Sequence, residues 1–554
     1  MIGNGRRGAA RSLASVGILG MLVFAAGCQS SSPSSSPSSG TSSDTIVIGI
    51  PGTPQGVDLD RESGPQSWTI AGQVLDLGLE WSRISYPFQS DGGINNNKIQ
   101  GFTYPALQQQ QTSPGLLTSC DLSSDGKTAI YHLRHGVKSA YGNELTSADV
   151  LFRVKRALAN NAIGAFLLGA ANANDINKWQ AVDKYTVKIT SPTPMPLICQ
   201  INTNEYWTYL DGTEIQKHET ASDPQANNWV PFHGDGFGPY YITKWIPGQE
   251  VDLSANPYYW AGVPKIKHII YKVIPEAANR VALLQSGGIQ MAEGLAPQDI
   301  ESLKGKPGVN VAAVRSNLSI YLVMNNQETP FNNPKVRQAI NYAIDRDQIV
   351  SKVYLGLAHN WQGVMPSLYP GYQSFNTYDY NISKAKQLLA EAGYPNGFNT
   401  VLSYNSGDAV QSNLAVVLQS SLKQLGINAT IQQQPPGPYS DRIQSKKETF
   451  GLWLDFPIQP DLNYSMRLFY LTGNAVNYQN YSNPQVDKIL QDCVSLSGQQ
   501  RISCNQPAEQ IIENDAPLGW IAEPDYLIAL SDKLAGWGWY TTQYYHVSSM
   551  SYIK

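Results

Sequence analysis

The chain has 554 residues, of which 42% are hydrophobic and 15% charged, and its formal net charge is −4. This length and composition predict a globular protein of two or three domains. The weakly acidic balance argues against nucleic acid as a partner, because binding to phosphates requires an excess of basic side chains.

Residues 1–27 have the composition of an export signal. Three arginines precede an apolar run from Leu13 to Gly27 that is too short to span a bilayer as a mature helix. The run ends in Ala25-Ala-Gly-Cys28, which resembles a bacterial lipobox, although Ala25 stands where leucine is usual. This resemblance implies cleavage before Cys28 and lipidation of its thiol. The alternative is an ordinary leader with a chance cysteine. Arg6-Arg7 also leave twin-arginine export open, but Gly8-Ala-Ala10 lack the apolar residues that such signals usually carry.

Residues 28–44 then form a Ser/Pro-rich tether behind the predicted lipid. Such a sequence buries too little apolar surface to order itself, and a coil of this length spans roughly 20–25 Å. We therefore expect a protein anchored to the outer face of the cell membrane, with a formal charge of −7 once residues 1–27 are removed.

Four cysteines remain besides Cys28, an even number in a chain expected to be exported. Three pairings are possible. We favour Cys493 with Cys504, which would close a short helical hairpin, and Cys120 with Cys199. Four buried free thiols are the alternative. The absence of a Cys-x-x-Cys spacing argues against a metal site.

Strands and helices are mixed along the rest of the chain. Alternating isoleucines predict a strand at 44–50, and similar patterns predict strands at 128–134, 250–254 and 269–274. Thr146 and Asp149 have the spacing of a capping box, which predicts a helix with Val150, Val154 and Ala157 on its buried face. Further helices are expected around 280–284, from Asn333-Pro334 through Ile344, and from Asn381 or Ser383 to Ala392, before Gly393.

Several strings together resemble the extracytoplasmic solute-binding proteins of family 5, which serve oligopeptide and dipeptide importers of the ABC type. They keep the family's order and extend over nearly the whole mature chain. These strings are Leu133-Arg-His-Gly-Val-Lys138, Leu145-Thr-Ser-Ala-Asp-Val150, Gly238-Pro-Tyr240, Asn256-Pro-Tyr-Tyr-Trp260, Lys335-Val-Arg-Gln-Ala-Ile-Asn-Tyr-Ala-Ile-Asp345, Lys384-Ala-Lys-Gln-Leu-Leu-Ala-Glu-Ala-Gly-Tyr-Pro395 and Asp515-Ala-Pro517.

The resemblance implies an α/β fold, namely the two-lobed periplasmic-binding-protein-like fold of type II, cluster C, with an extra subdomain inserted in lobe one. The family's layout assigns 45–85, 231–310 and 522–554 to lobe one, 86–230 to the insert and 311–521 to lobe two. A ligand bound in the interlobe cleft would stabilise a closed form, which a membrane permease could distinguish from the open form. We expect a monomer without a cofactor.

In peptide-binding members of this family, a segment resembling Gly-Trp-x-x-Asp-Tyr places its aspartate against the amino terminus of the peptide. The counterpart here is Gly451-Leu-Trp-Leu-Asp-Phe456, so Asp455 is the predicted ligand residue, with Trp453 and Phe456 beside it. Trp453 is one residue closer to the aspartate than in the family pattern. A structural acid capped by nearby amides is the alternative. In lobe one, the loop with Glu62, Ser63 and Gly64 is expected to approach the ligand.

The sequence contains no nucleophile elbow, no zinc-protease motif and no phosphate-binding loop, so we expect no enzymatic activity. His132 and His135 are the only close histidine pair, and on a strand they would project to opposite faces, which argues against metal binding. The high Tyr and Trp content keeps an oligosaccharide receptor of the same fold open as an alternative to a peptide receptor. A secreted hydrolase is the third possibility.

Overall fold

The computed structural model describes residues 44–61, 64–81, 84–87, 100–103, 112–161, 163–374, 377–540 and 545–553. All of them belong to one compact unit, Ser42–Lys554. The predicted signal peptide, Cys28 and the tether up to residue 43 lie outside the described residues. Among the helices of the described ranges, none has the length and apolar character needed to cross a bilayer.

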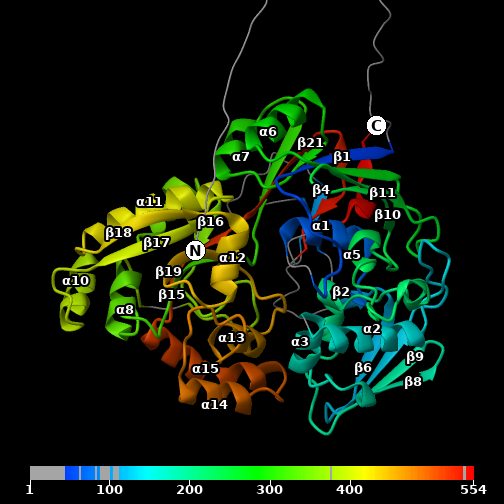
Figure 1. The fold of residues 1–554 in the computed structure, drawn as a ribbon, viewed down its shortest axis with the longest axis horizontal. Coiled ribbons are helices and arrows are strands. Elements are labelled where there is room, and N and C mark those ends of the chain that lie inside the picture. Colours follow the sequence, from blue (N-terminus) through cyan, green and yellow to red (C-terminus); the bar gives the residue numbers. More distant parts are fainter. Residues whose placement is uncertain are drawn as a thin grey trace, which may run out of the picture. The chain divides into compact units, whose positions relative to one another are not determined.

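Two large mixed sheets organise this unit (Figure 1). In spatial order, the seven-stranded sheet contains β10 (Tyr240–Ile246), β11 (Glu250–Ala255), β12 (His268–Val273), β1 (Thr45–Ile50), β13 (Met291–Ala292), β21 (Tyr526–Ser531) and β14 (Val309–Val314). The six-stranded sheet contains β16 (Ala358–Asn360), β20 (Leu518–Pro524), β15 (Ser319–Met324), β19 (Phe450–Asp455), β17 (Asn399–Asn405) and β18 (Asn428–Gln434). We call these sheets, with the elements packed on them, the first and second lobes.

A two-stranded antiparallel ribbon runs from one sheet into the other. β14 continues through residues 315–318 into β15, and β20 continues through Asp525 into β21. β14 pairs with β21 in the first lobe and β15 pairs with β20 in the second, so the two connections lie side by side. The Ser316 hydroxyl donates to the Pro524 carbonyl at 2.6 Å between them. The domain boundaries expected from the sequence remain predictions.

A third sheet belongs to the region that the family layout assigns to the insert. Its order is β6 (Leu117–Leu122), β7 (Thr128–Leu133), β9 (Thr186–Thr190) and β8 (Trp179–Asp183), with α2 (Ser147–Asn160) and α3 (Ile163–Ala170) nearby in the chain. The capping box at the start of α2 is confirmed: the Asp149 carboxylate accepts from the Thr146 amide at 2.8 Å. Val150, Val154 and Ala157 are buried, as predicted.

The predicted helices of the second lobe are also present. α8 (Pro334–Ala343) begins at the N-cap Asn333, and α10 (Ile382–Glu391) begins at the N-cap Asn381. One detail of the prediction is wrong: Ile344 is not helical, because it is the extended C-cap of α8. In the first lobe, α6 (Ala277–Ser286) contains residues 280–284, where the sequence predicts a helix.

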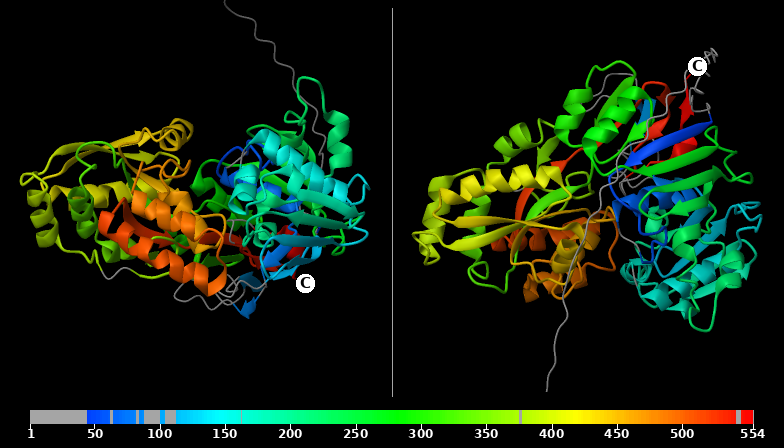
Figure 2. Two further views of the ribbon diagram at one scale, coloured as in Figure 1. Left: turned by 90° about the horizontal axis from the view of Figure 1, so that it is seen from below. Right: turned by 45° about the horizontal axis from the view of Figure 1, so that its top comes forward.

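The two faces of the six-stranded sheet carry different cores. α8, α10 and α11 (Ala409–Lys423) contribute to an aliphatic core that includes Leu322 and Leu452. The opposite face carries an aromatic-rich core that includes Tyr321 and Trp361, to which α13 (Leu462–Tyr470), α14 (Pro484–Asp492) and α15 (Gly498–Asp515) contribute. α14 and α15 lie side by side, in orange in Figure 2.

The structure contains two disulfides, and they join the pairs favoured from the sequence. Cys493 and Cys504 connect the C-cap of α14 to the middle of α15, with 5.8 Å between their Cα atoms. Cys120 of β6 is joined to Cys199, with a Cα–Cα distance of 5.6 Å. The first of these bonds closes a helical hairpin, and the second ties the third sheet to the segment that leads to Asn204.

Candidate functional site

Asp455 is the last residue of β19, at the edge of the aromatic-rich core. In the pairing with β15, Ser319 lies opposite Asp455 and Tyr321 lies opposite Trp453. Side chains alternate between the faces of a sheet, so these four residues share one face. Leu452 belongs to the aliphatic core on the other face, which fixes the register of the strand.

Two hydrogen bonds from described residues reach the Asp455 carboxylate. Oδ1 accepts from the Phe456 amide at 2.8 Å, and Oδ2 accepts from the Trp453 indole nitrogen at 3.3 Å. Burial raises the pKa of Asp455 to about 6, and the two hydrogen bonds lower it by less. No basic side chain of the described residues is among the causes of this pKa shift. Within the described ranges, the carboxylate therefore retains acceptor capacity and has no ion-pair partner.

Five buried tyrosines lie close enough to Asp455 for its charge to affect their pKa values. Burial is the main cause of the raised pKa of each tyrosine, and the negative charge of Asp455 adds to it. These tyrosines are Tyr206, Tyr321, Tyr369, Tyr464 and Tyr478. They stay protonated at neutral pH and cannot neutralise a ligand cation. The Tyr369 hydroxyl already donates to the Pro457 carbonyl, so only the other four could donate to a ligand.

The segment that follows Asp455 contacts the first lobe. Trp68 of α1 (Pro65–Val74) packs edge-on against Phe456, with 5.3 Å between ring centroids. The Asn204 side-chain amide donates to the Ile458 carbonyl at 2.6 Å, and the ring of Tyr206 lies 6.4 Å from that of Trp68. Elements of both lobes therefore meet at the segment that carries Asp455.

Several buried polar atoms here have no hydrogen-bond partner within the described part of the protein. Gln459 is fully buried, and both its amide nitrogen and its amide oxygen lack a partner. The same holds for the side-chain oxygens of Ser319, Tyr321, Tyr464 and Ser465. An unpaired buried polar group lowers stability by about 1–3 kcal/mol, so a ligand that hydrogen-bonds to these atoms would gain binding free energy. Similar atoms occur elsewhere, as at Trp207, so they support the site rather than define it.

The structure brings some of the predicted site residues together. Asp455, Trp453 and Phe456 are adjacent, and the indole of Trp453 is a donor to Asp455. Gly64 is the N-cap of α1, four residues before Trp68, whereas Glu62 and Ser63 lie outside the described residues. Ligand contact by all of these residues remains a prediction.

Sequence reasoning missed the contributions of Trp68, Asn204 and Tyr206. They lie roughly 250–390 residues before Asp455 in the chain, and only tertiary folding brings them to it. The one available signal was the excess of Tyr and Trp over Phe, which does not single out positions.

His132 and His135 correct another expectation. Both line a surface hollow of about 690 Å³ on the third sheet, together with Tyr185. β7 ends at Leu133, so the alternation of a strand does not extend to His135, whose ring stacks on Tyr185 at 4.0 Å. The described residues contain no cluster of three or more His, Cys, Asp or Glu that could hold a metal. The hollow does not include Asp455.

Comparison with known proteins establishes the family. The model of the bacterial extracellular solute-binding proteins, family 5 Middle, matches residues 111–477. The chain belongs to this family. It is therefore a substrate-binding protein of the ABC-transporter class, and the family resemblance stated from the sequence is confirmed.

Curated relatives of this family 5 protein match most of its length. The glutathione-binding protein GsiB of Pectobacterium atrosepticum is 28% identical over 486 residues, which cover 85% of this chain and 92% of the relative. The GsiB of Escherichia coli O1:K1 is 29% identical over 459 residues, covering 79% and 84%.

Solved structures confirm the two-lobed fold. The periplasmic binding protein DppA from Helicobacter pylori, in complex with the peptide STSA, has a TM-score of 0.78 at 24% identity, covering 92% of this chain and 98% of that one. A dipeptide-binding protein from Pseudoalteromonas sp. SM9913, in complex with Met-Leu, has a TM-score of 0.79 at 20% identity, covering 92% and 100%.

Proposed function

We propose that this family 5 protein captures a small peptide between its lobes and delivers it to an ABC permease, without chemical turnover. In this proposal the α-ammonium group of the peptide pairs with Asp455, and Cys28 carries the lipid that holds the protein outside the cell membrane. The observation that carries the proposal is the partly buried Asp455 carboxylate, whose pKa is raised by burial and which has no basic partner among the described residues. The relatives named for glutathione and dipeptide binding support the same ligand class.

Physical chemistry favours a cationic group at this position. An ammonium ion would complete the unsatisfied carboxylate with a charge-assisted hydrogen bond, which is roughly twice as strong as a neutral one. Protonated tyrosines and the Gln459 amide can hydrogen-bond to peptide groups, and the rings of Trp68 and Phe456 can cover apolar side chains. A ligand that contacts both lobes would favour their closed arrangement.

Calorimetric titration with defined ligands tests this proposal. The ligands are di- and tripeptides, glutathione, the same peptides with an acetylated amino terminus, and cello- or xylo-oligosaccharides. We expect free peptides to bind, and acetylation or Asp455→Asn to weaken binding about 100-fold, because each removes one partner of a shielded charge pair. Equal binding of acetylated peptides would contradict the role of Asp455.

Asp76→Asn provides a matched control. Asp76 is also buried, its pKa is raised to about 7, and it accepts from its neighbour's amide (Leu77) and from an indole (Trp260). It lies in the first lobe and makes none of the contacts with the Asp455 segment described above. We expect its substitution to leave peptide affinity unchanged. Preferential oligosaccharide binding would instead support the sugar receptor, and product formation during incubation would support a hydrolase.

A further inference from the structure

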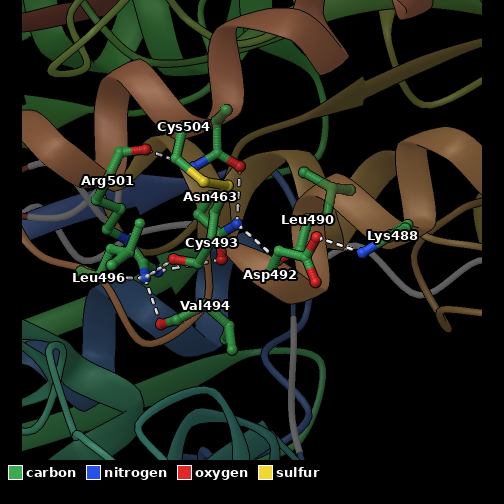
Figure 3. Close-up of a disulfide and its surroundings, with 10 residues drawn as sticks. Asn463, Lys488, Leu490, Asp492, Cys493, Val494, Leu496, Arg501 and Cys504 are labelled. Carbon is green, nitrogen blue, oxygen red and sulfur yellow. Dashed lines mark hydrogen bonds and ion pairs between the residues drawn. A yellow bond between two sulfur atoms is a disulfide. The ribbon is translucent and has the colours of Figure 1, made fainter.

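All three guanidinium nitrogens of Arg501, on α15, donate hydrogen bonds within the protein. Its side chain is 4% exposed. Nε and Nη2 donate to the two carboxylate oxygens of Asp461 at 2.9 and 2.8 Å. Nη1 donates to the carbonyls of Cys493, Val494 and Leu496 at 3.3, 2.5 and 3.2 Å (Figure 3).

Asp461 connects this arginine to the beginning of α13. It is the N-cap of that helix, and its carboxylate is buried with Arg501 as its ion-pair partner. Asn463, two residues later, accepts from Arg501 at 3.2 Å and donates to the Leu490 carbonyl and to the Asn505 side chain at 2.9 and 2.8 Å (Figure 3). The start of α13 is thereby joined to α14 and α15.

The connection from Asp461 back to Asp455 is short and stiff. Only five residues separate them, and two of these, Pro457 and Pro460, have a fixed φ. The Pro457 carbonyl also accepts from the buried Tyr369 hydroxyl. A displacement of Asp461 would therefore be transmitted to Asp455 rather than absorbed by the connection.

The disulfide holds the loop whose carbonyls receive Arg501. Cys493 is the C-cap of α14, and its partner Cys504 lies three residues after Arg501 on α15 (Figure 3). The bond keeps the loop that follows Cys493 over the helix that bears Arg501. Without it, the loop carbonyls could turn to water, and the guanidinium would lose the acceptors that orient it toward Asp461.

We propose that Arg501 is a positioning residue for ligand binding. It holds the Asp455–Asp461 segment in its binding conformation, and the Cys493–Cys504 disulfide keeps in place the loop that orients Arg501. This inference rests on the proposed function, because it takes Asp455 as the ligand contact. Removal of Arg501 would leave the buried Asp461 carboxylate unpaired, and its movement toward water would shift the segment.

The test compares Arg501→Gln and Arg501→Lys with Arg337→Gln. Arg337 is a matched control, because it is also buried and bonds to carbonyls at the other end of α15, at Asp515 and Ala516. We expect Arg501→Gln to weaken peptide binding about tenfold or more and Arg501→Lys to restore part of the loss. Arg337→Gln is expected to lower the melting temperature while peptide affinity stays within about threefold of wild type.

A double-mutant cycle tests the contribution of the disulfide. Cys493→Ser with Cys504→Ser should weaken peptide binding in the same direction as Arg501→Gln, and combining all three changes should weaken it no further than Arg501→Gln alone. Asp461→Asn keeps the capping oxygen but removes the charge, so it should also weaken binding. This variant keeps the inference testable if Arg501→Gln does not fold.

The outcomes separate this inference from the proposed function. If wild type binds no peptide, or binds it equally with Asp455→Asn, the proposed function fails. If wild type binds in an Asp455-dependent way, but Arg501→Gln and Asp461→Asn bind with wild-type affinity despite lower melting temperatures, then Arg501 is purely structural and the inference is overturned. Additive losses of affinity in the cycle would exclude the coupling between Arg501 and the disulfide.

Discussion

Asp455 has a raised pKa because burial disfavours its charged form more than the two hydrogen bonds from described residues favour it. Its folded-state pKa of about 6 lies above the ordinary value of 3.8. Between these pH values the folded state binds more protons than the unfolded state, so the free energy of unfolding falls as pH rises through this window. At neutral pH the ionised side chain destabilises the ligand-free protein by about 3 kcal/mol at most.

Replacement of Asp455 by asparagine should therefore raise the melting temperature of the ligand-free protein at pH 7.5. The reason is that the amide keeps the shape of the side chain but removes the poorly solvated charge. Differential scanning fluorimetry at pH 7.5 and pH 3.5 measures the effect, and the difference should shrink at the lower pH, where the carboxyl is protonated. A variant that melts below wild type at pH 7.5 would contradict the prediction.

The same pKa predicts the pH dependence of peptide binding. An ammonium group needs the ionised carboxylate, so affinity should be highest near pH 7 and fall about tenfold per pH unit well below 6. Above about pH 8 it should fall again, because the amino group of the peptide loses its own proton. Titration calorimetry at pH 7.5, 6.0 and 5.0 measures this profile. In Asp455→Asn the residual binding should not change over this range, and a parallel loss in both proteins would assign the titration to another group.

Asp455 could be predicted as a ligand residue because it lies in a short sequence motif. The residues around it come from distant parts of the chain, and no local motif identifies them. Trp68 and Asn204 reach the segment only through the packing of one lobe on the other. The burial of the Gln459 amide without a hydrogen-bond partner among the described residues is also a tertiary property, because any glutamine has the same polar atoms until folding buries them.

Helix caps explain why single elements were predictable. Each cap is a local hydrogen bond whose residues are close in sequence, as at Thr146, Asn333 and Asn381. The end of α8 was missed because the apolar periodicity continues to Ile344 while the backbone turns extended. The sheet orders were equally out of reach, since strands such as β1 and β12, more than 200 residues apart, pair only in the folded chain.

The capping box of α2 leads to a stability prediction. Thr146→Ala should lower stability by about 1 kcal/mol, because the first turn loses a side-chain acceptor, and Thr146→Ser should be nearly neutral. Asp149→Ala should cost more, since its carboxylate also accepts from the Gly212 amide at 3.0 Å and so links α2 to the next segment. Thermal melting of the three variants ranks these effects. Equal losses for serine and alanine would argue against the cap.

On the scale of the whole molecule, the predicted anchor determines where the protein is found. Cys28→Ala should move it from the membrane fraction to the soluble fraction of the producing cells or to their medium, because the acyl chains supply the membrane affinity. Ser30→Ala, in the adjacent tether, is the control and should stay with the membrane. Intact-mass measurement of the wild type should show a diacylated or triacylated amino-terminal cysteine, and an unmodified mature chain would disprove the anchor.

The ribbon formed by β14–β15 and β20–β21 has a consequence for how the protein unfolds. β14 continues directly into β15, and β20 into β21, so each continuous stretch of chain forms strands in both sheets. Unfolding of one sheet would therefore disrupt strands of the other. The lobes are thus not independent folding units, and Tyr464 and Leu468 of α13 also belong to the core that contains Ile46 and Ile48 of β1. Heating should produce one cooperative calorimetric peak. Cleavage of the backbone next to Asp525, between β20 and β21, should split that peak in two.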